Sequence, residues 1–406
     1  MVYRNDGLFL GLKKKMFWYL KEQNVFLLPF ILFSIGLWYV LSEVSNWFIS
    51  AKTGRPVIAF TGLYYNGNSR AVFEYLRNEY ADKYCCYWIA RNLKSFFDVK
   101  KNGGKVVYVY FPFSLASSIL KTDVLVTNDS SLSFLFKYKK PKIVQLWHGV
   151  GFKGRTSVVE GVDVWCEASD FTKKRRIENY GIDENKIYVT GLARMDKLLN
   201  YLKDDSSKKK ICDKLDIPYN RKIILYAPTW EVELFPFGKG EYKGFEKLCK
   251  FCESKNVVLI LRQHPYISGN KGEIKKILKK YNMVYSFSVD IQPRIMDLLA
   301  VADVLITDLS SIATDFFLTK KPIVFMDVYK DYFIKSGAGS FIPLEYRAGE
   351  IIKTEGGLYD AMRIILEKGN RFEKEQAKAL KKIHGDVDGR ASERVTEVIE
   401  KILEED

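Results

Sequence analysis

The chain has 406 residues, of which 47% are hydrophobic and 15% aromatic, and this composition excludes an intrinsically disordered protein. The length exceeds what one hydrophobic core usually serves, so we expect more than one domain. The formal net charge of +15 suits an anionic partner: nucleic acid, an anionic membrane surface or a phosphorylated substrate. The sequence has no aromatic-rich RNA-binding motif, so we expect no nucleic acid partner.

The cysteines do not form a recognisable framework. Six cysteines are too few for a disulfide scaffold in a chain of this size, which favours a reducing compartment. Cys249 and Cys252 form a lone C-x-x-C without a second pair or a nearby histidine, so we expect no metal there. Near the other end, the sequence "DVD" at 386–388 is expected to be a turn, and His384 a surface histidine.

The amino terminus carries an apolar stretch. Residues 25–41 include no charge over 17 positions, which is the short limit for spanning a bilayer. Lysines precede the stretch and tryptophans flank it, as in an interfacial anchor. A single span would place nearly all of the chain outside the cell, away from any nucleotide donor. We therefore expect residues 1–54 to be a helical membrane-associating segment, either one helix or a hairpin broken at Pro29, on the cytoplasmic face of the cell membrane; a buried core helix is the alternative.

Beyond residue 55, short apolar runs alternate with amphipathic segments, which is typical of a parallel α/β fold. The first series of expected strands comprises residues 56–62, 84–90, 105–111, 123–129, 142–149, 162–168 and 186–191, and an amphipathic helix is expected at 68–81. A charged stretch at 203–221 then suits a linker or a short helix. The second series of expected strands comprises residues 222–230, 257–265, 282–288, 303–308 and 322–328.

The two series indicate two doubly wound (Rossmann-like) domains that face a cleft. We expect one α/β domain at 55–205 and a second α/β domain at 206–385. Roughly the last 50 residues are expected to form two or three amphipathic helices, and the helix within 386–406 is expected to pack back on the first domain.

Polar residues at the strand ends locate a candidate site, because ligands of such sheets bind outside the carboxyl ends of the strands. His148 and His264, two of the three histidines, follow expected strands in different domains. In the sequence "LITDLSSIATDFFL" (305–318), Ser310 or Ser311 is a natural N-cap at a helix start that could receive a phosphate. Asp315 could bind ribose hydroxyls or complement the helix dipole, and ordinary capping is the structural alternative for the whole segment.

Five motifs, in this order, resemble the CDP-glycerol glycerophosphotransferase family of teichoic acid synthesis: "WHGVGFKG", "TGLARMD", "ILYAPTW", "LRQHP" and "ADVLITDLSSIATDFFLTKKPIVF". The sequence "VDGRASERV" at 387–395 resembles the short carboxyl-terminal signature of that family. The resemblance covers roughly residues 55–400. It implies a GT-B architecture with an acceptor-side domain at 55–205 and a CDP-binding domain at 206–385, and peripheral association with the membrane.

The resemblance also implies roles for individual residues. His148 would be the catalytic base, and Val150–Gly151 stands where the family usually has threonine–proline. Arg194 would contact the donor phosphate, and His264 would act at the pyrophosphate. The other implied donor-binding residues are Trp147, Gly149, Val150 and Gly151 in the loop, Pro228 and Thr229 beside the cytidine nucleotide, Arg262 and Gln263 at the pyrophosphate, and Ser310, Ser311 and Asp315 at the phosphate and ribose.

The implied reaction is attack of an acceptor hydroxyl on the β-phosphorus of CDP-glycerol or CDP-ribitol, with CMP leaving. A neutral histidine suits proton removal at physiological pH, and arginines with a helix N-terminus suit the phosphoryl charge, so we expect no metal or cofactor. The acceptor would be a lipid-linked or polymeric glycan. Two alternatives remain: a GT-B nucleotide-sugar glycosyltransferase of the cell envelope, and a non-catalytic membrane-bound protein that binds nucleotides or phosphopolymers.

Overall fold

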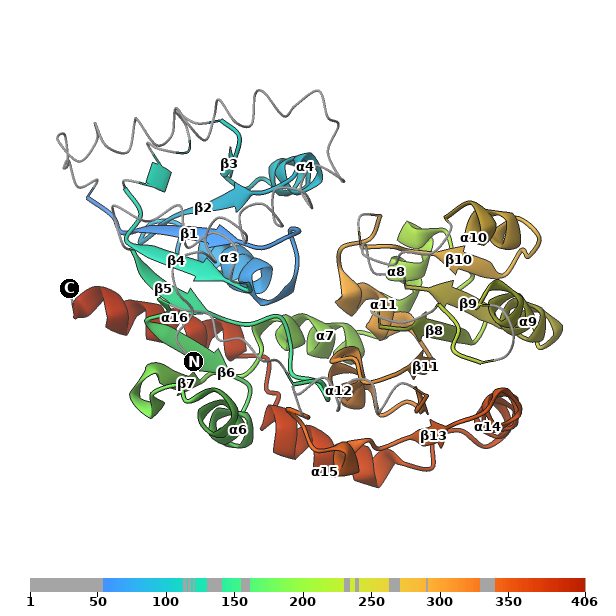
Figure 1. Ribbon diagram of the computed structural model, residues 1–406. Coiled ribbons are helices and arrows are strands. Elements are labelled where there is room, and N and C mark those ends of the chain that lie inside the picture. Colours follow the sequence, from blue (N-terminus) through green and yellow to red (C-terminus); the bar gives the residue numbers. More distant parts are fainter. Residues whose placement is uncertain are drawn as a thin grey trace, which may run out of the picture.

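The computed structural model describes residues 54–111, 115, 118–119, 121–129, 141–154, 161–229, 234–237, 241–262, 271–289, 291–328 and 340–405. These residues form two parallel sheets in two halves of the molecule (Figure 1). We call residues 54–205 the first half and residues 206–385 the second half. Residues 1–53, which carry the expected membrane-associating segment, lie outside the described residues.

The first sheet has the strand order β3-β2-β1-β4-β5-β6-β7, with every pair parallel. The order reverses between β1 and β4, which is the point where doubly wound sheets bind ligands. Its strands are β1 (Val57–Thr61), β2 (Cys85–Ala90), β3 (Val106–Tyr108), β4 (Val124–Thr127), β5 (Lys142–Gln145), β6 (Val164–Glu167) and β7 (Ile187–Val189).

The second sheet has the order β10-β9-β8-β11-β12-β13, again with every pair parallel. Here the order reverses between β8 and β11. Its strands are β8 (Ile223–Ala227), β9 (Val258–Leu261), β10 (Val284–Ser286), β11 (Val304–Thr307), β12 (Ile323–Met326) and β13 (Glu350–Ile352).

Helices cover the faces of both sheets, as parallel connections require. Those of the first half are α3 (Gly67–Glu79), α4 (Leu93–Lys101), α6 (Asp170–Tyr180), the short η3 (Glu184–Lys186) and α7 (Ala193–Lys203). The second half contributes α8 (Ser207–Leu215), α9 (Glu241–Ser254), α10 (Lys271–Leu278), α11 (Ile295–Val301), α12 (Ile312–Phe316), η4 (Phe317–Thr319), η5 (Leu344–Tyr346), α14 (Glu355–Lys368) and α15 (Glu373–His384), and α16 (Ala391–Glu404) ends the chain.

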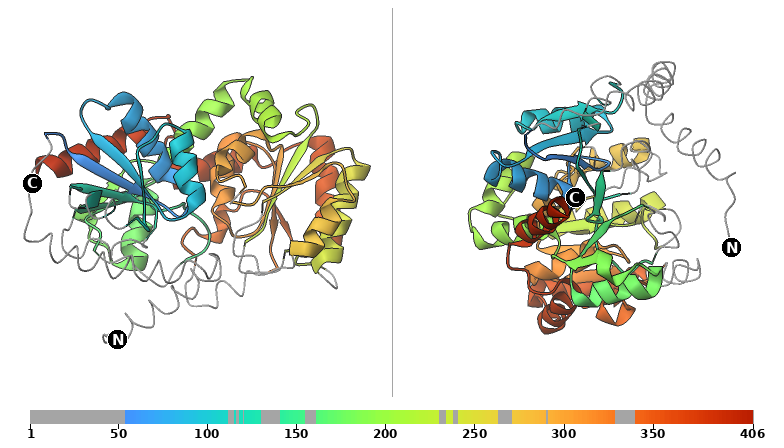
Figure 2. Two further views of the ribbon diagram at one scale, coloured as in Figure 1. Left: turned by 90° about the horizontal axis from the view of Figure 1, so that it is seen from above. Right: turned by 90° about the vertical axis from the view of Figure 1, so that its left-hand side faces the viewer.

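The last helix returns to the first half. Figures 1 and 2 show α16 running from the second half along the first sheet. Val395, Ile399 and Ile402 recur at the helical spacing of i, i+4 and i+7, and they share a buried cluster with Ile58 of β1. The core of the first half therefore depends on residues from the far end of the chain.

A second buried cluster joins the two halves. Val150 and Phe152, from the loop after β5, lie in the same cluster as Ile312 and Phe316 at α12. All four side chains are less than a tenth exposed, and burial of their apolar surface favours the contact at roughly 25 cal/mol per Å². The loop of the first half is therefore packed into the second half.

The parallel α/β fold expected from the sequence is confirmed. All twelve expected strands occur, each shorter than its apolar run, and β13 was missed. The charged stretch at 203–221, expected to be a linker or a short helix, contains the short helix α8. Within the described part of the chain, none of the helices combines the length and the apolar character needed to cross a membrane.

Candidate active site

The loop that follows β5 turns sharply and leaves His148 exposed. Trp147 adopts a left-handed backbone conformation with φ 54°, and Gly149 follows with φ 151°. A non-glycine residue seldom adopts positive φ, so this turn stores backbone strain. Gln145 supports the turn, because its side-chain oxygen accepts a hydrogen bond of 3.0 Å from the Trp147 N–H. An exposed imidazole on a fixed turn is placed to meet a substrate hydroxyl.

A buried asparagine of α3 fixes the start of this loop. The Asn68 amide donates to the carbonyls of Leu146 at 3.2 Å and Trp147 at 2.9 Å. Its oxygen accepts a hydrogen bond of 3.0 Å from the N–H of Arg194. Asn68 is 1% exposed, so removing it would leave buried backbone groups unpaired. Asn68 was not predicted as a site residue, and its one signal in the sequence is its position at the start of the expected helix 68–81.

Arg194, in the first turn of α7, joins the two halves. Its guanidinium forms an ion pair with Asp315 of α12 at 2.6 Å, and both side chains are less than a tenth exposed. The same guanidinium donates to the carbonyl of His148. Burial raises the pKa of Asp315, whereas the charge of Arg194 opposes that rise. The structure therefore places both residues behind the histidine loop and pairs them with each other, whereas the sequence suggested phosphate and ribose contacts for them.

Two glycines allow the loop to approach α12 closely. A Cβ built on Gly151 would lie 2.9 Å from the Cα of Ser311, and one on Gly149 would lie 2.5 Å from the Arg194 guanidinium. Real Cβ atoms do not approach other atoms this closely, so a larger residue at Gly151 would force the loop away from the start of α12, and one at Gly149 would displace the guanidinium of Arg194. Gly151, which the resemblance placed in the donor-binding loop, thus also serves contact between the halves, and Gly149 leaves room for Arg194.

Hydrogen bonds along the loop secure the same contact. The Thr314 hydroxyl donates to the carbonyl of Val150 at 2.5 Å, and the N–H of Ile342 donates to the carbonyl of Gly151 at 3.2 Å. One residue further on, the Ser340 hydroxyl donates to the Phe152 carbonyl at 2.8 Å. Three successive carbonyls of the first half are therefore bound by the second half.

Asp308 organises the strand ends of the second sheet. Its carboxylate accepts hydrogen bonds from the N–H of Thr229, at 2.7 Å, and from the Thr229 hydroxyl, and the Ser310 N–H also donates to it. Burial raises the pKa of Asp308, while these hydrogen bonds and the nearby charge of Lys153 lower it. Thr229 and Ser310, both suggested by the sequence, therefore meet through a residue that the sequence analysis did not select.

These strand ends lie at the reversal point of the second sheet. Pro228 and Thr229 follow β8, whereas Ser310 and Ser311 follow the neighbouring strand β11. Pro228 and Thr229 are buried, and the two serines are half-buried. Lys153 comes from the loop of the first half, so a cation of one half faces the ligand-binding edge of the other. The sequence analysis did not single out this lysine, although it lies within the quoted motif "WHGVGFKG".

Arg262 lies at the end of β9 and is 8% exposed. Its guanidinium donates to the carbonyls of Phe287 at 3.0 Å and Ser288 at 3.2 Å, and also to that of Gln292. These bonds hold the loop after β10, so the guanidinium of Arg262 is paired with main-chain carbonyls of the protein. Gln263 and His264, which the sequence places beside it in the second histidine motif, lie outside the described residues.

His384 was expected at the surface, and that prediction is wrong. The residue is 3% exposed and ends α15 against α12. Burial lowers the pKa of its imidazole to about 3, and the charge of Arg194 contributes to the shift. The polar neighbours of His384 in the sequence pointed to solvent, but its side chain lies on the buried face of α15 with Ala379 and Ile383.

The family model of CDP-Glycerol:Poly(glycerophosphate) glycerophosphotransferase matches residues 50–401 of the chain. A teichoic acid glycerol-phosphate transferase of Staphylococcus aureus is 25% identical over 370 residues, which cover 84% of this chain and 92% of that protein. The teichoic acid ribitol-phosphate polymerase TarL of the same species is 28% identical over 328 residues, which cover 71% of this chain and 53% of TarL. The chain thus spans about half the length of that polymerase.

Among solved structures, the wall teichoic acid polymerase TagF has a similar fold. One TagF structure superposes with a TM-score of 0.70 at 20% identity, over 98% of this chain and 99% of that one. A TagF variant soaked with CDPG gives a TM-score of 0.66 at 21% identity, over 87% of this chain and 90% of that one. At these identities the likeness supports the fold, in which two parallel α/β sheets face each other.

Proposed function

The chain belongs to the CDP-glycerol:poly(glycerophosphate) glycerophosphotransferase family, and on that premise we propose that it transfers an alditol phosphate from a CDP-alditol to an acceptor hydroxyl, releasing CMP. The observation that carries this proposal is the position of His148. It is exposed at the tip of a strained loop, and that loop is bound to α12 beside the reversal point of the second sheet. This edge is where a doubly wound sheet binds a nucleotide.

His148 is proposed as the general base. The hydroxyl of an acceptor has a pKa far above neutrality, so a base must remove its proton as the oxygen attacks the β-phosphorus. The new phosphorus–oxygen bond forms as the bond to the CMP oxygen breaks, and CMP leaves with the electron pair. A positioned base contributes about 10²- to 10⁴-fold to such a rate.

The donor is proposed to bind at the strand ends that Asp308 organises. Thr229 and Pro228 would lie beside the cytidine, and Ser310 and Ser311 beside the phosphates. Lys153 supplies a cation that faces this edge, and charge stabilisation of this kind dominates phosphoryl transfer. Gln263 and His264 keep the pyrophosphate role that the resemblance implies for them.

For three of the residues that the resemblance implies as ligand contacts, we propose a structural role instead. Arg194 and Asp315 are proposed to hold the His148 loop, because each is the other's buried partner. Arg262 is proposed to hold the loop after β10. Fewer cations are therefore left for the phosphates than the sequence suggested. That transfer needs no metal or cofactor remains a prediction, which adding a chelator to the assay tests.

The acceptor is proposed to be a hydroxyl of a lipid-linked or polymeric glycan of the cell envelope. The curated relatives include both glycerol-phosphate and ribitol-phosphate enzymes, with similar identities of 25% and 28%. We therefore propose both CDP-glycerol and CDP-ribitol as candidate donors. The same relatives include transferases and polymerases, so the proposal covers transfer of one unit and of many.

Peripheral association with the cytoplasmic face of the cell membrane is proposed from the sequence. Residues 25–41 carry no charge and follow several lysines, a pattern suited to an anionic interface. Flotation of the full chain with vesicles tests this. We expect binding to vesicles that contain phosphatidylglycerol and much weaker binding to phosphatidylcholine alone, and equal binding to both would refute the electrostatic part.

The test of function follows CMP by mass spectrometry. The full chain is incubated with acceptor-bearing membranes and, in parallel, with CDP-glycerol, CDP-ribitol or UDP-sugars. We expect CMP release from at least one CDP-alditol, and loss of that release in His148→Ala. Turnover of a UDP-sugar alone would favour the glycosyltransferase alternative, and binding of CDP without turnover would favour the non-catalytic one.

A further inference from the structure

The segment 384–394, which we call the C-terminal strap, passes behind the candidate active site. It begins at His384, the last residue of α15, and ends in the first turn of α16. Helix α15 packs on α12 of the second half and on α6 of the first half. The strap is thus the second covalent connection between the halves, after the link between α7 and α8.

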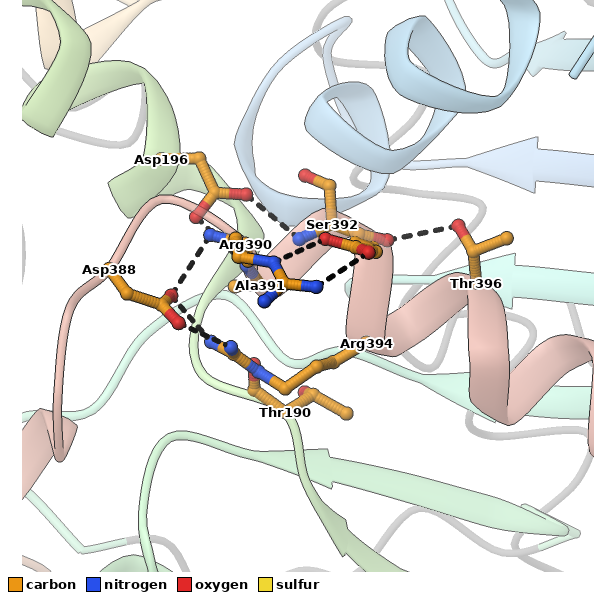
Figure 3. Close-up of polar contacts among 9 residues, drawn as sticks. Thr190, Asp196, Asp388, Arg390, Ala391, Ser392, Arg394 and Thr396 are labelled. Carbon is orange, nitrogen blue, oxygen red and sulfur yellow. Dashed lines mark hydrogen bonds and ion pairs between the residues drawn. The ribbon is translucent and has the colours of Figure 1, made fainter. Parts of the chain in front are cut away.

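The first half anchors the strap at both ends. At its start, the Ser169 hydroxyl donates to the carbonyls of Lys382 at 3.0 Å and Ile383 at 2.9 Å. At its end, the Asp196 carboxylate accepts hydrogen bonds from the N–H groups of Ala391 at 3.1 Å and Ser392 at 2.8 Å (Figure 3). Asp196 therefore caps the N-terminus of α16 from another helix, as a side-chain N-cap does within one chain segment.

Arg394 holds the C-terminal end of the strap against the first half. Its Nε donates to the carbonyl of Thr190 at 2.8 Å, and its guanidinium forms an ion pair of 2.8 Å with Asp388 (Figure 3). Thr190 lies just before α7, and Asp196 lies two residues after Arg194 in its first turn. The strap is therefore attached to the same turn of α7 that carries Arg194 to the His148 loop.

His384 lies between these anchors, and the charge of Arg194 acts on its ring. Among the described residues, neither ring nitrogen of His384 has a hydrogen-bond partner, and the same holds for the Nε of Arg194. Buried polar groups are usually paired, so these unpaired atoms of two neighbouring residues in the site need an explanation beyond packing. The main chain of Thr314 lies beside the ring as well, which puts His384 against two residues that hold the His148 loop.

We propose that His384 is a positioning residue, whose uncharged ring supports Arg194 from behind and so keeps the guanidinium on Asp315 and on the carbonyl of His148. This inference rests on the proposed function, because the effect is read through His148 as the base. Burial lowers the pKa of His384 to about 3, so the ring is neutral at physiological pH. A neutral ring does not compete with Asp315 for the arginine, as a carboxylate would, nor repel it, as a cation would.

The decisive variant is His384→Ala, compared with Gln376→Ala. Gln376 is also fully buried on α15, but it bonds to Asn370, Lys321 and Ala348 and not to the His148 loop. We expect His384→Ala to lower kcat about tenfold or more, because small displacements of catalytic groups have effects of this size, with little change in the KM for the CDP-alditol. His384→Gln should restore kcat to within about threefold of the parent, because the amide is neutral and comparable in length.

Crystal structures of the parent and of His384→Ala supply a readout that does not need activity. We expect Arg194 to leave the His148 carbonyl in the variant. If Arg194 stays in place, or if Gln376→Ala lowers kcat as much as His384→Ala does, the proposal is overturned. If the parent turns over no CDP-alditol, the proposed function fails, yet the position of Arg194 still decides the structural claim. Should the alanine protein be insoluble, His384→Asn takes its place, with the same two readouts.

Discussion

His148 and His384 are both linked to Arg194, and they differ in almost everything else. His148 is exposed on a strained loop of the first half, whereas His384 is 3% exposed at the end of α15. Arg194 binds the main-chain carbonyl of the first, and its charge helps to lower the pKa of the second. The comparison separates a group that can meet a substrate from one that acts only through its neighbours.

Removing the exposed imidazole of His148 should give the largest difference between the two histidines. We expect His148→Ala to lower kcat about 10²- to 10⁴-fold, which is the usual contribution of a general base. Stability should hardly change, because an exposed side chain contributes little to folding. Rates of CMP release and melting temperatures check both parts. Lys174→Ala, an exposed change on α6, is the control, and a near-parental rate in His148→Ala would contradict the assignment.

Removing the shared arginine should affect folding as well as activity. Arg194→Met leaves Asp315, at 2% exposure, buried without its partner, and we expect a loss of about 3–5 kcal/mol in the free energy of unfolding. The double variant Arg194→Met/Asp315→Leu removes the unpaired charge, so it should regain part of that stability. Activity should stay low in both, because the His148 carbonyl has lost its donor. Full activity in the double variant would show that the pair does not position the loop.

The buried histidine predicts a specific dependence of stability on pH. The pKa of His384 is lowered from 6.5 to about 3 in the folded state, so between these values the unfolded chain binds a proton that the native chain does not. Stability therefore falls as the pH falls through this window. Between pH 7 and pH 5, the free energy of unfolding should fall by roughly 2 kcal/mol more in the parent than in His384→Gln, because glutamine does not bind a proton. Urea unfolding of both proteins at the two pH values measures it, and parallel losses would refute the buried neutral ring.

A single hydrogen bond to the loop gives the smallest effect. Thr314→Val removes the donor to the Val150 carbonyl, and we expect a loss of about 1 kcal/mol in stability with a modest fall in kcat. Thr319→Val is the matched control, because its hydroxyl bonds only to nearby main chain in the same helical stretch. If the two variants have equal kcat, the bond to Val150 contributes nothing to the position of His148.

The sheets could be predicted because their central strands are continuous apolar runs. The run "IILYA" of β8 and the run "VLIT" of β11 are wholly buried, and such runs are typical of parallel strands covered on both faces. β13 was missed because it has three residues, one of them Glu350 and one an exposed Ile351. An edge strand this short lacks the pattern that sequence reasoning depends on.

The site was predictable only where a residue follows directly from a strand end. His148, Thr229 and Ser310 were selected in that way, and the structure places all three directly after strand ends. The pairing of Arg194 with Asp315 spans 121 positions in the chain, and nothing local distinguishes a charge that binds a ligand from one that binds another charge. His384 was misread because lysines precede it, although the buried Ala379 and Ile383 on the same helix lie on its inward face.

The return of α16 to the first sheet means that the boundary at residue 205 does not divide the chain into independent parts. A fragment that ends there lacks Val395, Ile399 and Ile402, and its face along Ile58 would meet water instead of a helix. During synthesis, the core of the first half is therefore complete only after the last residues have left the ribosome. Its folding is coupled to that of the second half by the order in which the ribosome delivers them.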